Sequence, residues 1–328
     1  MDRKDLIPLL AMPLLLLAVE FGAILLSLPV QASGITAFED PSSMENPVIF
    51  IAILLGFTIF LLVLIRYNLR RVIAGILTLA IFFTFVYIFM ALVYAAMGAT
   101  AVGTKEWWDA VVPASAIASA DAAGITATLI VFILAALATF LLYRYPEWYV
   151  IDALGILIGS GVAAIFGASL EVLPVVLLLA ILAVYDAISV YKTKHMITLA
   201  EGVVDLKTPI LFVVPKRRDY SFIKEGIGKI TGGEGAEGEK HERAAFIIGM
   251  GDLIMPAILV VSANVFLTSA KYGGLVNLPA LGAIVGSAAG LIVLLHFVMS
   301  GRPQAGLPPI NGGAILGFLI GWAAVGWV

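Results

Sequence analysis

Nine apolar stretches, each close to 20 residues long, most constrain the fold of this 328-residue chain. A helix needs about 20 apolar residues to cross the hydrocarbon core of a bilayer. The chain is 62% hydrophobic and 12% charged, whereas soluble domains are about 45–50% apolar and about 25% charged. We therefore predict an all-α polytopic membrane protein with about nine transmembrane helices, at residues 6–30, 47–65, 72–97, 122–143, 149–168, 172–191, 244–268, 278–299 and 308–327.

The predicted helices form one membrane domain over residues 1–328, in which 1–168 supplies five scaffold helices and 172–328 supplies four more. The first apolar stretch exceeds the roughly 7–15 residues of a signal peptide, so we expect a retained helix. A break at Glu171 and Pro174 separates the fifth and sixth helices. The longest connection, 192–243, is Gly/Glu-rich at 231–240, and this part is predicted to be flexible.

Lys and Arg residues predict how the chain is oriented. If alternate connections are assigned to one side, beginning with the N-terminus, that side holds all 19 Lys and Arg residues except Lys105 and Lys271. Cytoplasmic connections carry such an excess, so we predict a cytosolic N-terminus and an outside C-terminus. A wrong helix count would scramble this bias, which therefore also supports nine helices.

Four acidic residues fall within the predicted helices: Glu20, Asp152, Asp186 and Asp252. Charge inside a bilayer is costly, so each intramembrane acid is a functional candidate. We interpret Glu20 and Asp152 as structural acids that are hydrogen-bonded between helices. Asp152 lies near the predicted cytosolic interface, where water is an alternative partner.

Asp186 and Asp252 differ from the other two acids because their depths match. Asp186 lies six residues before Lys192, and Asp252 lies nine residues after Arg243. These separations place them roughly 9 Å and 13 Å from the cytosolic face. The two helices are sequence neighbours that run antiparallel, so we expect the two carboxyl groups to meet.

Two carboxyl groups that meet inside a membrane have a predictable chemistry. They cannot both ionise readily and would share one proton. One would take a proton from water while the other polarises a peptide carbonyl, which hydrolyses a peptide without metal or cofactor. Gly249 and Gly251 predict the close approach of a neighbouring helix, and Pro256 predicts a kink, because the carbonyl of Asp252 loses its helical partner.

Two short motifs around these acids resemble a known family. Tyr185-Asp186 and Gly249-Met250-Gly251-Asp252 resemble the Tyr-Asp and Gly-x-Gly-Asp motifs of the presenilin and signal peptide peptidase family. The resemblance covers about 172–328 and implies that Asp186 and Asp252 are the catalytic aspartates of an intramembrane aspartyl protease. The family also has nine transmembrane helices. The absence of cysteine and the compact connections are typical of a prokaryotic, especially archaeal, homologue.

The family's third motif is Pro-Ala-Leu at the start of the last helix. A literal Pro279-Ala280-Leu281 opens the eighth predicted helix on the outer side, and we interpret it as a chance match. The last helix opens with Leu307-Pro308-Pro309-Ile310 in the depth layer of the two acids. We therefore map the motif to Pro308, Pro309 and Ile310, which departs from the family pattern in two of three residues.

The resemblance also implies a substrate and its location. The predicted orientation is that of presenilin, so the expected substrates are single-pass transmembrane helices whose N-termini lie outside, cleaved within a multi-pass protein of the cell membrane. The expected partners are these substrates and lipid but not nucleic acid, and homo-oligomerisation is left open. A run of β-formers resembles the presenilin segment that pairs with an unwound substrate; it comprises Ile210, Leu211, Phe212, Val213 and Val214.

Four other classes of membrane protein differ from this interpretation in the residues or features that they need or lack. A site-2 metalloprotease needs His-Glu-x-x-His, but His241-Glu242 has Ala245 in the second His position. A rhomboid-type protease needs an intramembrane Ser–His pair, and no His shares the layer of Ser160. A prepilin peptidase also uses Gly-x-Gly-Asp but lacks a proline-rich final helix. A proton-coupled transporter or channel uses similar acids, and the missing internal repeat argues against it.

Overall fold

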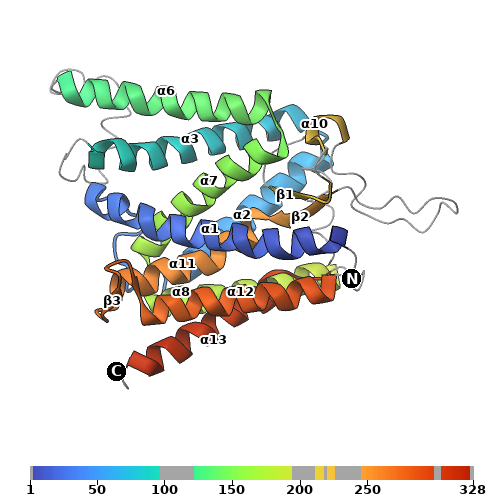
Figure 1. Ribbon diagram of the computed structural model, residues 1–328. Helices are drawn as coiled ribbons and strands as arrows, with labels where there is room; N and C mark the ends of the chain where they lie inside the picture. Colours follow the sequence, from blue (N-terminus) through green and yellow to red (C-terminus); the bar gives the residue numbers. More distant parts are fainter. Residues whose placement is uncertain are drawn as a thin grey trace, which may run out of the picture.

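The computed structural model describes residues 3–96, 122–193, 211–217, 220–225, 245–298 and 304–325. Its long helices run roughly side by side as a bundle (Figure 1). They are α1 (Arg3–Ser33), α2 (Asn46–Arg66), α3 (Arg70–Ala96), α6 (Ala122–Arg144), α7 (Trp148–Ser169), α8 (Val172–Ile188), α11 (Met250–Phe266), α12 (Leu278–Val298) and α13 (Leu307–Val325). Eight of these are long and apolar enough to cross a membrane, and α11 is a shorter apolar helix. Within the described residues, the predicted nine-helix membrane protein is confirmed.

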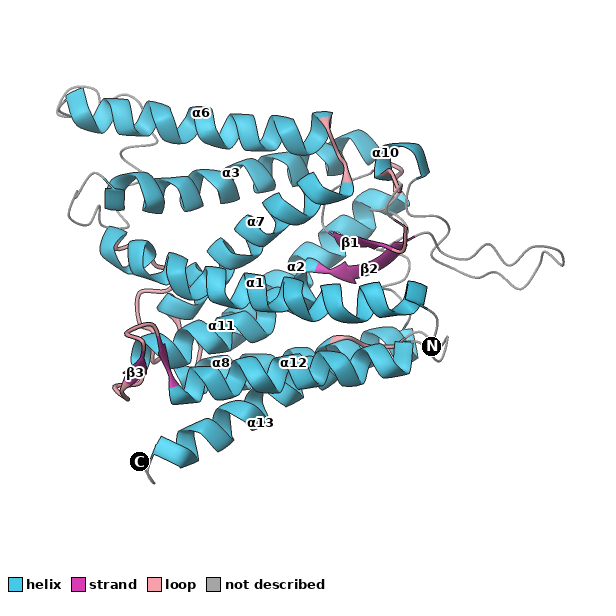
Figure 2. Ribbon diagram, in the orientation of Figure 1, coloured by secondary structure: helices cyan, strands magenta, loops and turns pink. Residues whose placement is uncertain are grey.

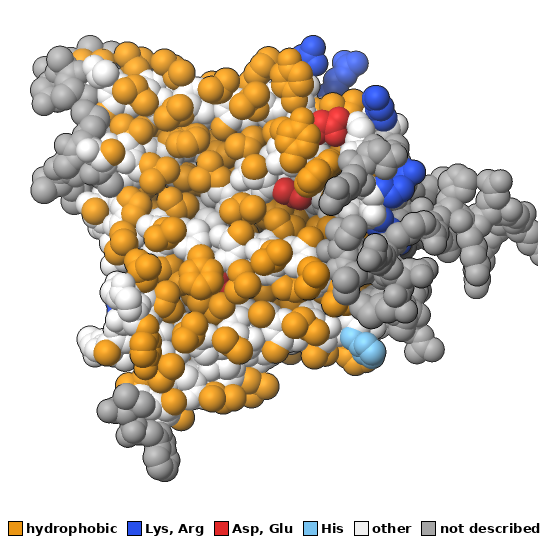
Figure 3. All heavy atoms as spheres, viewed as in Figure 1, with side chains coloured by type: hydrophobic (Ala, Val, Ile, Leu, Met, Phe, Trp, Pro, Cys, Tyr) orange, Lys and Arg blue, Asp and Glu red, His pale blue; other side chains and the backbone are white. Residues whose placement is uncertain are grey.

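The surface of the bundle has the character expected of a protein in lipid. Large apolar side chains such as Ile53, Ile133 and Ile320 are more than 60% exposed along the flanks, and Figure 3 shows this apolar surface along the described helices. In the same view, Lys and Arg side chains gather near one end of the bundle, around β1 and α10. The N-terminal end of α1 and the C-terminal end of α13 lie at opposite ends (Figure 1).

A short antiparallel sheet lies at the basic end of the bundle (Figure 2). Strands β1 (Leu211–Pro215) and β2 (Ala245–Gly249) pair with Val213 opposite Ile247. The predicted strand is therefore confirmed from Leu211, while Ile210 and the predicted flexible stretch 231–240 lie outside the described residues. The short helix α10 (Phe222–Glu225) follows β1.

The predicted seventh helix, 244–268, is wrong at its start. Residues Ala245–Gly249 form β2, and the helix begins only at Met250. A short apolar run that contains Phe246, Ile247 and Ile248 suits a strand as well as a buried helix, and its periodicity does not separate the two. Pairing with β1 decides the outcome. At about 1.5 Å per residue, the 17 residues of α11 span only roughly 26 Å, and β2 precedes them directly.

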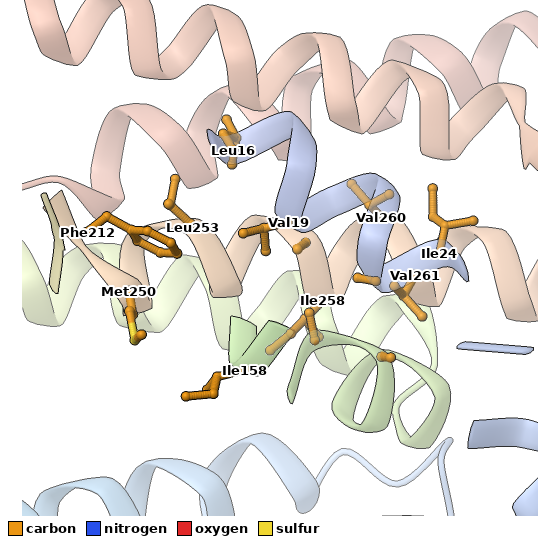
Figure 4. Packing of buried hydrophobic residues seen from close by; sticks show 14 of the residues in the cluster. Leu16, Val19, Ile24, Ile158, Phe212, Met250, Leu253, Ile258, Val260 and Val261 are labelled. Carbon is orange, nitrogen blue, oxygen red and sulfur yellow. The ribbon is translucent and has the colours of Figure 1, made fainter. Parts of the chain in front are cut away.

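Helix α11 is the centre of the bundle. The run Ala257–Val261 is completely buried, and α11 packs against α1, α7, α8, α12 and α13. Figure 4 shows Ile258, Val260 and Val261 of α11 packed among side chains of α1 and α7. Pro256 lies inside the helix, so the carbonyl of Asp252 has no N–H to accept from that position.

Helices α12 and α13 are joined by contact of their backbones. A Cβ placed on Gly286 would collide with the carbonyl of Gly313, and one placed on Gly313 would collide with the carbonyl of Gly286. Gly282 and Gly317 oppose each other in the same way one turn further on. Small residues at such spacing allow transmembrane helices to approach closely. This contact fixes the position of α13, whose first residues reach the candidate site.

Candidate active site

Asp186 lies in the last turn of α8 and is only 6% exposed. The chain continues into one π-helical turn, η1 (Ser189–Thr193). The predicted break before α8 is confirmed, because Leu170 and Glu171 have extended backbones between α7 and α8, while Pro174 lies in the first turn of α8. π-turns are frequent at functional sites. The change from α-helix to π-helix lies three residues after Asp186.

Asp252 lies in the first turn of α11, where the chain changes from strand to helix. Gly249 is the N-cap with an extended backbone, and a Cβ there would lie 3.5 Å from Oδ2 of Asp252. Helices α8 and α11 pack together, and the carboxyl groups of Asp186 and Asp252 are close enough to interact electrostatically. The structure thus brings together the two acids that the sequence placed at one depth.

The segment in front of α13 touches both acids. The backbone N–H of Leu307 donates to Oδ2 of Asp186 at 3.0 Å, and the N–H of Gly306 also donates to this carboxyl group. A Cβ on Gly306 would lie 2.7 Å from Oδ2 of Asp252, so a larger residue at this position would displace the carboxyl group. The first N–H groups of a helix have no intrahelical acceptor, and here they are satisfied by Asp186.

The residues mapped to the family's third motif follow directly on the segment that contacts the acids. The carbonyl of Pro309 and the Cα of Ile310 lie against Gly290 of α12, whereas the contacts with the acids come from Gly306 and Leu307. Pro308 and Pro309 occupy the first turn of α13, where a missing N–H costs no helical bond. Leu307 was among the residues predicted from the sequence and Gly306 was not, although a glycine directly before a helix with prolines in its first turn is a recognisable signal.

The literal Pro279-Ala280-Leu281 lies far along the bundle from the acids. It belongs to the first turn of α12, where Pro279 adjoins Gly321 near the C-terminal end of α13. Leu307 begins the opposite end of that helix. This position agrees with the interpretation of Pro279-Ala280-Leu281 as a chance match.

The other residues of the two motifs differ in how deeply they are buried. Tyr185 is half-buried beside Asp186, and Met250 is buried while Gly251 is exposed. The expectation that Gly251 admits a neighbouring helix is wrong, because a Cβ placed there would meet no atom within 4 Å. The close approaches in this region are instead at Gly306 and at Gly155 of α7.

Tyr191, in the π-turn after Asp186, is a further residue that the sequence analysis missed. Its hydroxyl group donates to Oε1 of Gln304 at 2.8 Å and accepts the N–H of Ala305 at 3.3 Å. Asp186 and Tyr191 together hold the segment 304–307 to the end of α8. The π-turn brings a tyrosine to this segment, and no sequence pattern indicates that winding.

We expect Tyr191→Phe to lower kcat/KM for a cleaved substrate by roughly threefold to tenfold. A hydroxyl hydrogen bond contributes about 0.5–1.5 kcal/mol, and its loss leaves Gly306 less firmly placed against Asp252. Tyr272→Phe is the matched control, because Tyr272 is exposed. It lies on strand β3 (Lys271–Tyr272), which is not part of the site. Equal kcat/KM for Tyr191→Phe and Tyr272→Phe would contradict this role.

The two remaining intramembrane acids each have a hydrogen-bond partner on another element. Oε1 of Glu20 on α1 lies 2.6 Å from the hydroxyl of Ser287 on α12, and Glu20 is completely buried. Oδ1 of Asp152 on α7 accepts the N–H of Val213 on β1 at 2.9 Å. Glu20 is thus hydrogen-bonded between two helices, as predicted, whereas Asp152 is hydrogen-bonded between a helix and a strand.

The chain is similar to known proteins over nearly its whole length. A family model described as signal-peptide peptidase, presenilin aspartyl protease matches residues 12–121 and 110–327. A solved structure of a presenilin family intramembrane aspartate protease in space group C222 is 47% identical, with a TM-score of 0.66 over 97% of this chain and 99% of that chain. Another, in space group P2, is 48% identical, with a TM-score of 0.63 over 97% and 98%. A comparison with curated proteins gave no match.

Proposed function

The chain belongs to the signal-peptide peptidase and presenilin aspartyl protease family and is an intramembrane aspartic endopeptidase, and we propose that Asp186 and Asp252 are its catalytic pair. The observation that carries this proposal is the contact of one backbone segment, Gly306-Leu307, with both carboxyl groups. Three helices, α8, α11 and α13, meet at that point. The proposal needs no metal ion and no cofactor.

The surroundings of the two acids support different roles for them. Asp186 accepts backbone N–H groups from Leu307 and Gly306 and is therefore the partner better placed to carry negative charge. Asp252 then holds the shared proton. In the proposed reaction, Asp186 takes a proton from a water molecule while the water oxygen attacks the peptide carbonyl carbon. Asp252 donates its proton to the carbonyl oxygen. When the tetrahedral gem-diol collapses, the C–N bond breaks as Asp186 donates its proton to the departing amine, and Asp252 takes a proton from a gem-diol hydroxyl, which restores the starting protonation of the pair.

The proposed substrates are single-pass transmembrane helices with their N-termini outside. The gathering of described Lys and Arg residues near the end that carries β1 supports a cytosolic location for this end. Asp186 and Asp252 lie towards that same end, since one follows most of α8 and the other opens α11. Cleavage within the cell membrane near its cytosolic face follows from this orientation.

The β1–β2 sheet is the proposed binding template for an unwound substrate, and β2 is the strand whose outer edge is unpaired among the described residues. Because the N–H of Val213 points to Asp152 rather than to β2, Val213 and Ile247 form a non-hydrogen-bonded pair. The backbone groups of Ile247 therefore point away from β1. Strand β1 packs against α7, and Pro215 offers no N–H at its outer edge. We therefore propose that a substrate strand adds to β2, which leads directly to Asp252, rather than to the run 210–214 that the resemblance implied.

We expect Ile247→Pro to raise KM for a transmembrane substrate by roughly tenfold, the effect of one lost backbone hydrogen bond of about 1 kcal/mol with some local strain. The substitution removes an N–H that β1 does not use, and proline is tolerated at an outward-facing edge position. Ile247→Val is the matched control, because it keeps the N–H and the β-branched side chain. An unchanged KM in both variants would place the substrate elsewhere.

Cleavage of a single-pass helix by the purified wild-type protein in liposomes tests the proposed function. Products that disappear when a transition-state analogue of peptide hydrolysis is added would support the paired-aspartate mechanism. Failure to cleave, with normal helicity and a single elution peak, would count against it. Proton flux across the same liposomes is the second readout, because a proton-coupled transporter is the alternative use of two such acids.

A further inference from the structure

Helix α7 contributes a carboxyl group to the sheet rather than to the catalytic pair. Oδ1 of Asp152 accepts the backbone N–H of Val213 at 2.9 Å. Asp152 is 8% exposed and Val213 is 1% exposed. A buried N–H without an acceptor would cost about 1–3 kcal/mol, so this contact favours one position of β1 along α7.

A second carboxyl group at the start of α7 holds the continuation of β1. Oε1 of Glu147 accepts the hydroxyl of Ser221 at 2.7 Å, and Oε2 accepts the N–H of Phe222 at 3.0 Å. Phe222 begins α10 and is buried. Asp152 of α7 therefore holds β1 itself, and Glu147, the N-cap of α7, holds Ser221 and Phe222 after the strand.

Between these polar contacts and the catalytic pair, α7 packs directly on the motif that carries Asp252. A Cβ on Gly155 would lie 3.0 Å from the ring of Phe212 and 3.1 Å from the terminal methyl of Met250. Phe212 is completely buried and Met250 is 7% exposed. Figure 4 shows these two side chains close together between the strand and the helices. One face of α7 thus contacts both β1 and the Gly-Met-Gly-Asp sequence.

Strand β2 depends on this attachment. It pairs with β1 along one edge, and its extensive contacts within the described residues are with β1, whereas β1 packs on α7 and α1. We propose that Asp152 is a positioning residue that fixes the β1–β2 sheet on α7 and so sets which substrate bond lies at Asp252. This inference rests on the proposed function of the sheet as the substrate template, and Glu147 holds the far end of the same segment.

Substitutions at Asp152 separate a positioning role from general stabilisation. Asp152→Leu has a similar size but no acceptor, and we expect it to raise KM roughly tenfold and to add products cut at neighbouring peptide bonds. Asp152→Asn keeps an acceptor oxygen and should restore the wild-type KM and product masses. Ser160→Ala is the control, because it removes a buried hydrogen bond from the same helix to Val19 of α1, away from the sheet.

The readouts are product masses by mass spectrometry, kcat and KM determined separately, and hydrogen exchange of the β1 amides. Faster exchange in Asp152→Leu than in Asp152→Asn, together with altered product masses, would support the inference. A folded Asp152→Leu with the wild-type KM, product masses and β1 exchange overturns it, as does a loss of kcat alone that matches Ser160→Ala.

Two further measurements keep the test decisive. If Asp152→Leu does not fold, Glu147→Ala at the half-buried start of α7 takes its place, with the same shift in KM and product masses expected. Its wild-type behaviour would then overturn the inference. If the wild-type protein cleaves no substrate, the proposed function fails, while the exchange comparison still decides whether Asp152 anchors β1.

Discussion

Asp252→Asn and Asp186→Asn should each lower the rate of substrate cleavage by at least about a hundredfold, and by up to about 10⁴-fold. Asparagine has the size of aspartate but neither accepts a proton from water nor supplies one to a peptide carbonyl. Both side chains lie against the Gly306-Leu307 segment, so the isosteric change keeps the packing while it removes the chemistry. The measurement is the rate of product formation in liposomes at saturating substrate.

Glu20→Gln is the matched control for these two variants. It is also a substitution of a buried intramembrane acid by its amide, and the Gln side chain keeps a hydrogen bond to Ser287 on α12. We expect it to cleave at close to the wild-type rate. Normal cleavage by either Asn variant would remove Asp186 and Asp252 from the mechanism, whereas equal loss in all three would indicate that amides disturb the bundle generally.

The meeting of the Asp186 and Asp252 carboxyl groups could be predicted from the sequence because the prediction needed few assumptions. Counting from Lys192 and Arg243 requires only helical rise and two antiparallel neighbours, and these held for the last turn of α8 and the first turn of α11. The exact start of α11 did not matter to the outcome. A strand advances further per residue than a helix, but Asp252 lies only two residues into the helix.

The contacts of the site were harder to predict because they depend on backbone geometry. Gly251 and Gly306 are indistinguishable as residues, yet an added Cβ would meet the Asp252 carboxyl group only at Gly306 and would meet no atom within 4 Å at Gly251. Which glycine is needed depends on the packing of α13 against α12, a long-range property. Similarly, Tyr191 reaches Gln304 from a π-turn, and Asp152 meets Val213 across 61 residues of sequence. Neither contact leaves a periodic pattern in the sequence.

The contact between α12 and α13 predicts the second large effect. We expect Gly313→Val to lower the melting temperature and to reduce cleavage by roughly a hundredfold. The new side chain would collide with the carbonyl of Gly286, and backbone does not move aside as a flexible side chain does. Overpacking costs about 1–3 kcal/mol. The displaced α13 also carries Leu307 away from Asp186, and a misplacement of about 1 Å costs about a hundredfold in rate.

Gly312→Val is the matched control on the same helix, since a Cβ at Gly312 would meet no atom within 4 Å. Valine lowers helix propensity equally at both positions, so any difference between the variants isolates the contact with Gly286. Melting temperature in detergent and cleavage rate in liposomes are the two measurements. If Gly312→Val and Gly313→Val behaved alike, the backbone contact would not position α13, and Gly306 and Leu307 would owe their place at the acids to Asp186 and Tyr191 alone.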